Sequence, residues 1–513
     1  MGTGLGLVHD SIRQLRCGRL GCGPSWQGGN SSCKKLRYDV GMAGAFSQLQ
    51  HFVVVMLENR SFDNVAGFLY ADDDPPKHFL PAGTEPRFRG MPLDYSNPSN
   101  PDYFRNGAPP NPVPVVQGAA NFQVPDPDPQ ELFDDITFQL FGNTNPHPGQ
   151  IPPMNGFLVS YQRVAKQNPN QIMQCYTPEQ LPVLSHLARG FAISDAWYSP
   201  CPCQTFPNRA FMHLGTSCGE VNNWPYDPFK YDVPTIFNVL TEMKVDWAIY
   251  NDSIFESATR LQFPKLWDLQ LEKHFRGFDD FQENARQGKL PRYCFVEPSF
   301  LIDPNDEHPP HDMLLGERFL WQVWNAVASG AHWESTLLLI TYDEHGGCCD
   351  HQPPPWGATP PDDGRGENGF GFDRYGVRVP AVLVSPWIEP GTVFRSPTKR
   401  PYDHTSVLAT LRDWLLIPHN SMLPSARVAE APTLEQVLTR SAPRTEIPAI
   451  PYPAGTPVRH PLTLHPNHFQ RGLAMALAHR YGVRGAAKAV ENLVTRQHIA
   501  DFFTRHTVRP PKY

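Results

Sequence analysis

The sequence predicts an α/β fold, with a mainly parallel central sheet that has helices on both faces. Three observations lead to this prediction. Apolar, β-branched runs recur along the chain, helical patterns lie between them, and the 56 prolines and 38 glycines favour long ordered loops over a helical bundle. Continuous apolar runs of this kind are typical of strands buried on both faces, as in a parallel sheet covered by helices.

The expected elements follow in chain order. We expect strands in the mainly apolar runs at residues 51–57, 245–250, 336–342 and 381–385. We expect helices at residues 182–189 and 315–329, and a helical stretch from about residue 468 to residue 505. Residues 70–150 are rich in Pro, Asn and Asp, so we expect a long loop excursion there.

The 513 residues suffice for one large domain with extensions or for several smaller domains. We expect a poorly ordered N-terminal extension at residues 1–49, with Met42 as an alternative start, and the main folded domain at residues 50–420. Residues 421–513 predict a Pro-rich segment and a C-terminal helical extension, which either packs on the core or mediates oligomerisation. The oligomeric state stays open.

Composition excludes several classes of protein. The formal net charge of -7, without a dense Lys/Arg stripe, argues against nucleic acid as a partner. The sequence contains no apolar run of the roughly 18–20 residues that a membrane-spanning helix needs, and no apolar core of a signal peptide. The cytoplasm is therefore the default expectation. The ten cysteines leave the redox compartment open, because metal ligands, disulfides and inert thiols are all compatible with their spacing.

Acidic residues follow two of the predicted strands. Glu58 and Asn59 come directly after residues 51–57, and Asp343-Glu344-His345 comes directly after residues 336–342. Because ligands of open α/β sheets bind outside the carboxyl ends of strands, these side chains are expected to meet. Three clustered carboxylates are costly unless a cation neutralises them. Oxygen ligands suit Mg, Ca or Mn, and a nearby His also admits Zn or Fe. The alternative is that each acid caps a helix or loop.

A threonine precedes a proline in residues 205–209, which read TFPNR. A hydroxyl in front of a proline-fixed turn is held in an extended conformation and can be presented rigidly. Threonine becomes a nucleophile only when its hydroxyl loses a proton, and metal coordination is one way to achieve that. The alternative interpretation is an ordinary loop element.

Histidines are dense in the second half of the main domain, at His308, His311, His345, His351 and His404. A histidine can protonate a leaving alkoxide or donate a hydrogen bond to phosphate oxygens. His345 is the best single candidate because it adjoins the two acids. For each of the others a structural or solvated role is the alternative.

Five sequence blocks, in order across about residues 50–420, carry a family resemblance. They are 58–63 with Gly67, 205–209, 343–347 with Asp350-His351, 376–380 with 385–387, and 403–406. With these blocks the sequence resembles the phosphoesterase family that contains bacterial phospholipases C, plant non-specific phospholipases C and a related acid phosphatase. The resemblance implies that residues 50–420 form a phosphoesterase catalytic domain with the α/β sandwich of the alkaline phosphatase and sulfatase superfamily.

The resemblance also implies a set of site residues. One divalent metal ion (Ca, Mg, Mn or Zn) would be held by Glu58, Asn59, Thr205, Asp343 and Glu344. Thr205 would be the nucleophile, and the further catalytic candidates are His345, His308, His404 and His147. The candidates for substrate binding are Asn208, Arg209, His311 and His351. The sequence departs from the family at Asn155, where the family usually has Asp, and at the loop residues 203–204 and 348–349, which leaves substrate choice open.

The expected function is hydrolysis of phosphate esters. The first interpretation is a phosphodiesterase of phospholipase C type that acts through a metal-activated threonine and a phosphothreonine intermediate. The alternatives are a phosphomonoesterase similar to the acid phosphatase and a non-enzymatic binding module. The expected partners are a phospholipid or a small phosphate ester, together with contact to a membrane surface, and no nucleic acid.

Overall fold

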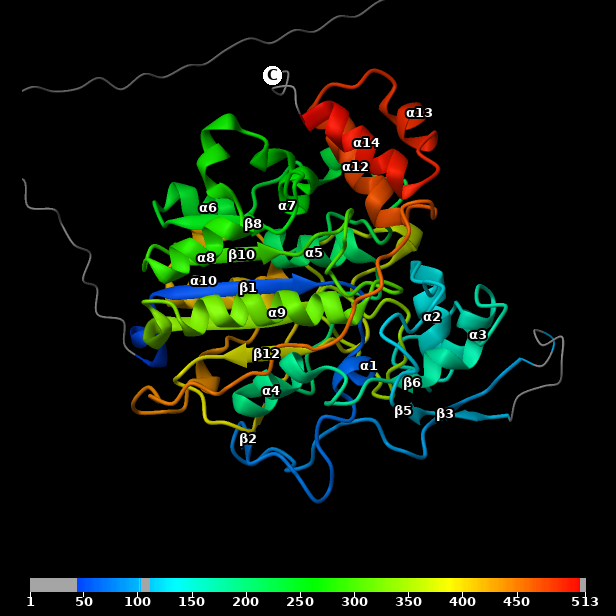
Figure 1. Cartoon of the computed structure of the whole chain (residues 1–513), viewed down its shortest axis with the longest axis horizontal. Coiled ribbons are helices and arrows are strands. Elements are labelled where there is room, and N and C mark those ends of the chain that lie inside the picture. Colours follow the sequence, from blue (N-terminus) through cyan, green and yellow to red (C-terminus); the bar gives the residue numbers. More distant parts are fainter. Residues whose placement is uncertain (1–43, 101, 103–110, 508–513) are drawn as a thin grey trace, which may run out of the picture. The chain divides into compact units, whose positions relative to one another are not determined.

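The computed structural model describes residues 44–100, 102 and 111–507, which belong to one compact unit. The predicted N-terminal extension lies outside these described residues, except for residues 44–49. Nine strands form one mixed sheet at the centre of the unit (Figure 1). Their order in the sheet is β2 (His78–Leu80), β13 (Thr392–Phe394), β7 (Ala192–Ser194), β12 (Ala381–Val384), β11 (Thr336–Tyr342), β1 (His51–Leu57), β10 (Tyr293–Glu297), β8 (Trp247–Asn251) and β9 (Phe275–Gly277).

The sheet is mainly parallel, as predicted. β1 pairs in parallel with both β10 and β11, and only β12 runs antiparallel to its two neighbours, β11 and β7. Two further pairs of short strands lie outside this sheet, namely β3 (Ser96–Asn97) with β4 (Val113–Pro114), and β5 (Val116–Gln117) with β6 (Gln174–Cys175).

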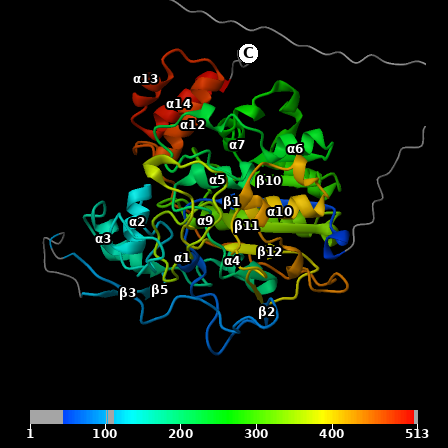
Figure 2. The ribbon, with the colours of Figure 1, turned by 180° about the vertical axis from the view of Figure 1, so that it is seen from behind.

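Helices cover both faces of the sheet, which confirms the predicted architecture. Figure 1 shows one face with α4 (Pro182–Gly190), α8 (Phe278–Arg286) and α9 (Met313–Ala328). The opposite face, turned forward in Figure 2, carries α5 (Thr205–Leu214), α6 (Ile236–Glu242) and α10 (Thr405–Trp414). The remaining helices are α1 (Phe62–Ala66), α2 (Phe133–Phe141), α3 (Phe157–Gln162), α7 (Ala258–Gln262), α11 (Ala426–Glu430), α12 (His468–Arg480), α13 (Ala486–Glu491) and α14 (Arg496–Thr507).

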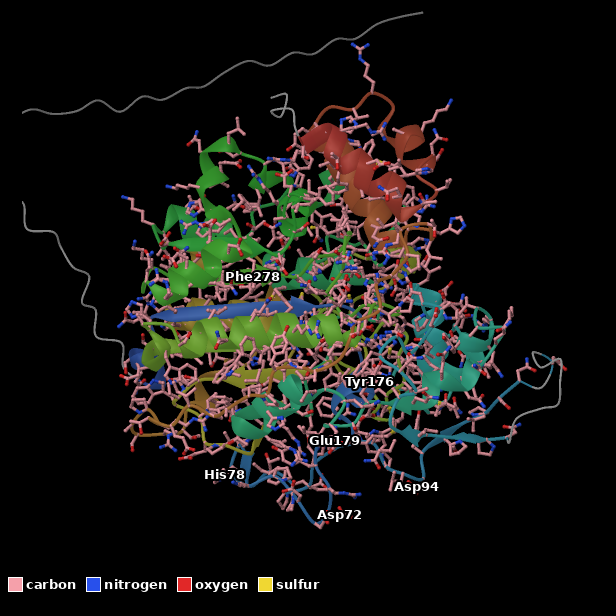
Figure 3. All side chains as sticks on the ribbon, in the orientation of Figure 1. Asp72, His78, Asp94, Tyr176, Glu179 and Phe278 are labelled. Atoms are coloured by element: carbon pink, nitrogen blue, oxygen red, sulfur yellow. The ribbon has the colours of Figure 1, made fainter. Side chains whose placement is uncertain are left out.

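The predicted loop excursion at residues 70–150 lies at the surface for much of its length. Asp72, His78 and Asp94 are exposed, and Figure 3 shows their side chains along one border of the molecule. The excursion nevertheless contains α2, which the density of Pro, Asn and Asp did not indicate. Within the described residues, no helix combines the length and the apolar character that crossing a membrane requires.

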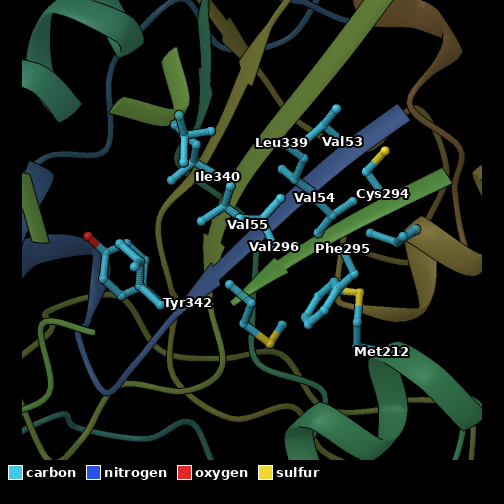
Figure 4. Close-up of a cluster of buried hydrophobic side chains, with 14 of the residues drawn as sticks. Val53, Val54, Val55, Met212, Cys294, Phe295, Val296, Leu339, Ile340 and Tyr342 are labelled. Carbon is cyan, nitrogen blue, oxygen red and sulfur yellow. The ribbon is translucent and has the colours of Figure 1, made fainter. Parts of the chain in front are cut away.

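The two strands that end in acids lie side by side at the centre of the core. Every residue of β1 and β11 is buried, and Figure 4 shows Val54, Val55 and Ile340 packed together with side chains of β10. Leu57 and Tyr342, the last residues of the two strands, are paired across the sheet. The residues that follow them, Glu58 and Asp343, therefore leave the sheet next to each other.

Candidate active site

The two acidic strand ends meet directly, as predicted. The backbone N–H of Asn59 donates to Asp343 Oδ1 at 2.9 Å, and the backbone N–H of Glu344 donates to the same oxygen at 2.8 Å. Glu58, Asn59, Asp343 and Glu344 are all fully buried. The parallel pairing of β1 with β11 thus creates a closed cluster of carboxylates and one amide at the carboxyl edge of the sheet.

Thr205 completes this cluster. Its Oγ1 lies 3.4 Å from Glu58 Oε2 and 3.5 Å from Asn59 Oδ1, and the residue is fully buried. The expected proline turn is wrong, because Thr205 is the first residue of helix α5 and Pro207 lies in its first turn. A proline is tolerated there, since the N–H groups of the first turn have no partner within the helix.

In each carboxylate of the cluster, one oxygen accepts hydrogen bonds from backbone N–H groups or from Arg209, and the other oxygen has no such partner. Asp343 Oδ2 and Glu344 Oε1 are buried without a hydrogen-bond partner, whereas Glu344 Oε2 accepts from the N–H of Gly346 at 2.8 Å. Glu58 Oε1 accepts from Arg209 Nε at 2.9 Å, and its Oε2 faces only Thr205. Buried oxygens without partners are unfavourable unless something compensates them.

The amide of Asn59 is oriented by its neighbours. Its Nδ2 donates to Glu131 Oε2 and approaches His308 Nε2 at 3.1 Å. Both hydrogens of the amide nitrogen are therefore used, and Oδ1 must be the atom that faces Thr205. Glu131 also accepts from Gln204 Nε2 at 2.9 Å, so one buried carboxylate holds two amides.

Burial and mutual repulsion raise the pKa values of the acids in the cluster. The pKa values of Glu58 and Glu344 lie well above the ordinary value of 4.5. Burial is the largest cause, and the neighbouring charge of Asp343 is the second. Burial first, and Glu344 next, likewise raise the pKa of Glu131. The guanidinium of Arg209 is the nearby positive charge, and it is itself fully buried against Glu58. When these acids are ionised, they carry more negative charge than the single guanidinium of Arg209 offsets.

These residues fit a divalent metal ion. The oxygens that lack a protein partner, Asp343 Oδ2 and Glu344 Oε1, join Glu58 Oε2, the oriented Asn59 Oδ1 and Thr205 Oγ1 as an all-oxygen set. Hard oxygen ligands of this kind suit Ca, Mg or Mn. Among the described residues, two groups of acids with a histidine have ligand atoms close enough together to share an ion, namely Asp128-Glu131-His308 and Asp63-Asp350-His351. In the second group, however, Arg378 already pairs with both acids, at 2.9 and 3.1 Å.

The three leading histidine candidates lie around the cluster. His308 Nε2 faces the amide nitrogens of Asn59 and Asn467, each at 3.1 Å, and its Nδ1 faces the carbonyl of Pro309 at 2.6 Å. His345 lies between Gln139 Oε1 at 2.9 Å and Glu344 Oε2 at 3.1 Å. Burial lowers the pKa of both imidazoles to about 3.

His404 is engaged on both ring nitrogens. Its Nε2 donates to the backbone carbonyl of Asp343 at 2.6 Å, and its Nδ1 accepts from the indole N–H of Trp197 at 3.2 Å. It also forms the N-terminal boundary of α10. The geometry therefore assigns His404 to positioning Asp343.

The other residues predicted for substrate binding or catalysis make their polar contacts outside the acidic cluster. Both side-chain ends of Asn208 bond within the loop at residues 201–204, so this amide supports the start of α5. His311 is buried and bonds Asp306 at 2.6 Å, while His351 is half-buried and bonds Asp63 at 2.6 Å. His147 is exposed, and its polar contacts are local, to Pro148 and Gln150. The catalytic role of His147 stays a prediction.

Several residues of the site were not found from the sequence. Glu131 and Asp128 come from the Pro-rich loop excursion and do not follow a predicted strand, while Gln204 was noted only as a departure from the family. Asn467 comes from the C-terminal extension. The acid-rich run before α2 is the only signal that could have indicated the two acids.

The C-terminal extension covers the cluster. Phe469 of α12 packs on Phe206 with ring centroids 4.9 Å apart, and on Phe300 at 5.2 Å. A Cβ placed on Gly472 would lie 2.3 Å from the ring of Phe206, so α12 approaches α5 as closely as a glycine allows. Phe206 follows Thr205 in the chain, so α12 packs directly on the residue next to the predicted nucleophile.

Comparisons with known proteins identify relatives of this chain. The model of the phosphoesterase family matches residues 49–417. Non-specific phospholipase C6 of Arabidopsis thaliana is 33% identical over 416 residues, which are 78% of this chain and 74% of that protein. Phospholipase C B of Mycobacterium tuberculosis is 27% identical over 422 residues, 73% of this chain and 75% of that protein.

Solved structures that match include an alkaline phosphatase superfamily protein from Vibrio parahaemolyticus. It is 10% identical, covers 50% of this chain and 62% of that chain, and has a TM-score of 0.28. The assignment therefore depends on the sequence match, which spans most of the main domain. The chain belongs to the phosphoesterase family, and it is an enzyme that hydrolyses phosphate esters.

Proposed function

We propose that this enzyme cleaves phospholipid phosphodiesters in the manner of a phospholipase C, with Thr205 as the nucleophile. The observation that carries the proposal is the position of Thr205 Oγ1, 3.4 Å from Glu58 Oε2 and 3.5 Å from Asn59 Oδ1 in a buried acidic cluster. The relatives named phospholipase C in Arabidopsis thaliana and Mycobacterium tuberculosis support the substrate class.

The five oxygen-bearing residues of the cluster would hold one divalent ion, which would lower the pKa of the Thr205 hydroxyl and offset the charge of the phosphate. As Thr205 Oγ attacks phosphorus, its proton is taken up by water, and Glu58 Oε2, 3.4 Å away, keeps the hydroxyl oriented. The bond from phosphorus to the glycerol oxygen breaks, and diacylglycerol leaves. Water hydrolyses the phosphothreonine, which releases the phosphorylated head group and restores the threonine.

The protein contributes mainly position and a dry environment. Arg209 holds Glu58, His404 holds the backbone of Asp343, and Glu131 holds Asn59. Fixing the reacting groups before the substrate arrives removes the cost of arranging them during the reaction. The leaving alkoxide needs a proton, and His345 and His308 are the histidines that lie beside the cluster with no backbone-positioning role toward Asp343. His308 accepts from Asn59 at Nε2, so it would first have to take up a proton there.

A second candidate is a phosphomonoesterase similar to an acid phosphatase. The full burial of Thr205 favours it, because a small monoester reaches an enclosed nucleophile more easily than a lipid does. Purified enzyme should be given phosphatidylcholine and a simple monoester with each candidate metal. Release of phosphocholine supports the first proposal, and release of phosphate only from the monoester supports the second.

The nucleophile is tested on whichever substrate is cleaved. Thr205→Ala should lower kcat by several orders of magnitude, and Thr205→Ser should keep part of the activity, since the hydroxyl is retained. If the alanine variant keeps more than about a tenth of the turnover, another group makes the covalent bond and the assignment is wrong.

A further inference from the structure

A cavity opens at the same edge of the sheet as the acidic cluster. It has a volume of about 630 Å³ and is formed by four loops, at residues 85–92, 196–198, 351–355 and 398–401. These loops follow β2, β7, β11 and β13, which all run in the same direction. The carboxyl edge of strands is where α/β sheets bind ligands. None of the five predicted metal ligands lines this cavity.

The loop that forms one wall is held by buried charges. Arg395 donates to the backbone carbonyls of Glu85 at 2.9 Å and Arg87 at 2.5 Å, and Arg378 donates to the carbonyl of Arg89 at 2.8 Å. Asp195 pairs with Arg395 at 2.8 Å and accepts from the N–H of Arg89 at 2.9 Å. The backbone of this wall is therefore fixed from beneath, which leaves its side chains to face the cavity.

The rim carries more positive than negative charge. Arg87, Arg89 and Lys399 line the cavity, and Glu85 is the single acid among its lining residues. Arg89 meets Glu85 only at 3.8 Å, and both side chains are substantially exposed, which makes a weak pair. Within the described part of the chain, neither Arg87 nor Lys399 has a side-chain partner. A locally positive cavity on a chain with a net charge of -7 is a selective feature for anions.

The inner wall adds hydrogen-bonding groups. His351 Nδ1 donates to Asp63 Oδ2 at 2.6 Å, and this bond sets the ring so that Nε2 is the acceptor nitrogen. That Nε2 lies 3.0 Å from the amide nitrogen of Gln352, which also lines the cavity. Asp63 is fully satisfied by His351 and Arg378, so its negative charge is compensated beneath the cavity rather than presented to it.

We propose that this cavity binds a phosphate-bearing anion, at a site separate from the acidic cluster where the ester is cleaved. Two forked guanidinium groups, an ammonium and an amide N–H are the donors that recognise phosphate oxygens. The same chemistry serves a free phosphate compound and the head group of an anionic lipid. The proposal goes beyond the proposed function and does not depend on Thr205.

The test is equilibrium binding by the full-length protein. Glycerol 3-phosphate is titrated calorimetrically, and sedimentation is measured with vesicles of phosphatidylcholine and phosphatidic acid in equal amounts, with pure phosphatidylcholine vesicles as reference. Arg87→Glu with Lys399→Glu should weaken binding by about tenfold or more, because each change replaces a charge-assisted contact with a repulsive one. Vesicle binding is measured in the Thr205→Ala background, so that turnover cannot remove the lipid.

Lys289→Glu with Arg484→Glu is the matched control, since both residues are exposed, lie outside the cavity and change the net charge equally. This variant should bind as the wild type does. Loss of glycerol 3-phosphate binding in the cavity variant alone supports a site for free phosphate compounds, and selective loss of phosphatidic acid vesicles supports a lipid head group. Equal losses in both double variants, or no binding of either probe by the wild type, would overturn the proposal. An active Thr205→Ala variant would refute the nucleophile and leave the glycerol 3-phosphate titration intact.

Discussion

At the scale of single residues, the site depends on which atom of each side chain faces the centre. Asn59 Oδ1 faces Thr205 only because both amide hydrogens of Asn59 are taken by Glu131 and His308. Glu131 accepts from two amides at once, those of Asn59 and Gln204. Groups that orient the ligands of a metal site often affect metal affinity as strongly as some of the ligands do.

Glu131→Gln is therefore expected to weaken metal binding. A glutamine has one carbonyl oxygen, so one of the two amides would face an NH₂ group and Asn59 could turn. The metal dissociation constant should rise roughly 10–100-fold, with activity partly restored by added metal. A metal titration of both proteins measures this. Asp72→Asn, an exposed acid-to-amide change, is the control (Figure 3). Unchanged metal affinity in Glu131→Gln would contradict the orienting role.

The leaving-group acid can be identified with two substrates. A nitrophenyl ester leaves as a stable anion, whereas an alkyl or lipid ester needs a proton. His308→Ala or His345→Ala, at the true acid, should slow the alkyl ester roughly a hundredfold or more and the activated ester much less. His404→Ala should slow both substrates alike, because His404 holds the backbone of Asp343.

Steady-state rates on the two esters decide between these roles. Equal losses for His308→Ala and for His345→Ala on both esters would mean that neither histidine donates the proton. The proton source would then have to be sought in water, and this part of the proposed mechanism would be withdrawn.

At the scale of elements, the close approach of α12 to α5 links the C-terminal extension to the predicted nucleophile. Phe469 is buried between Phe206 and Phe300, and Gly472 provides the clearance for Phe206. The extension thus packs on the core, which is one of the two roles that the sequence left open. Its single predicted helical stretch is divided into α12, α13 and α14, with Gly482 and Gly485 at positive φ between the first two.

Gly472→Ala is expected to destabilise the protein although alanine favours helices. Helix propensity contributes about 1 kcal/mol in its favour, while forcing a Cβ against a buried ring typically costs about 1–3 kcal/mol. We expect a net loss of about 1 kcal/mol in the free energy of unfolding, together with lower turnover, because Phe206 adjoins Thr205.

Gly190→Ala is the matched change, since Gly190 also lies in a helix and its added Cβ would meet only ordinary contacts at 3.8 Å and beyond. Denaturant unfolding and turnover are measured for both variants. Equal stability and turnover in the two variants would show that α12 does not bear on the site through this contact.

At the scale of the whole molecule, folding stability should depend on pH through buried neutral histidines. His213 is fully buried among Phe237, Phe263 and Phe295, and neither ring nitrogen has a hydrogen-bond partner. Burial first, and the charge of Arg209 next, lower the pKa of His213 well below 6.5. Below about pH 6.5 the His213 imidazole binds a proton in the unfolded chain but not in the folded protein. The free energy of unfolding therefore falls as the pH falls.

His213→Leu should therefore flatten the acid side of the stability profile. Between about pH 6.5 and the folded pKa, one such group contributes up to about 1.4 kcal/mol per pH unit. The free energy of unfolding, measured by denaturant at about pH 7 and about pH 5, should drop less in the variant than in the wild type. His78→Leu, at an exposed position labelled in Figure 3, should keep the wild-type slope. If His213→Leu leaves the pH dependence of the free energy of unfolding unchanged, His213 is not the group responsible for it.

Metal removal should act on the whole molecule as well as on activity. Without a cation, Glu58, Asp343 and Glu344 repel one another in a buried site. A ligand that binds only the folded state stabilises it by mass action, so chelation should lower Tm and abolish turnover, and readdition of the metal should restore both. Calorimetry with metal analysis checks this. A fully active protein without bound metal would exclude the predicted metal site.

The sequence by itself determined the strands that hold the site. Residues 51–57 and 336–342 are mainly apolar, and such runs are typically buried as strands, so β1 and β11 end where predicted. Glu58 and Asp343 meet because neighbouring parallel strands end at the same edge. β7 and β10 were not predicted, and the antiparallel direction of β12 was not visible either, since an apolar run carries no information about the direction of its neighbours.

Only the tertiary structure decided what surrounds those strand ends. Glu131, Gln204 and Asn467 come from loops and helix starts that carry no periodic signal, and they reach the site through contacts between distant segments. The Thr205 block was predicted as a turn, yet packing against the sheet makes it the start of a helix, because a first-turn proline costs no helical hydrogen bond. Local sequence sets which segments are apolar and where charges lie along them. Which charges become neighbours depends on how the segments pack, and that information is distributed over the whole chain.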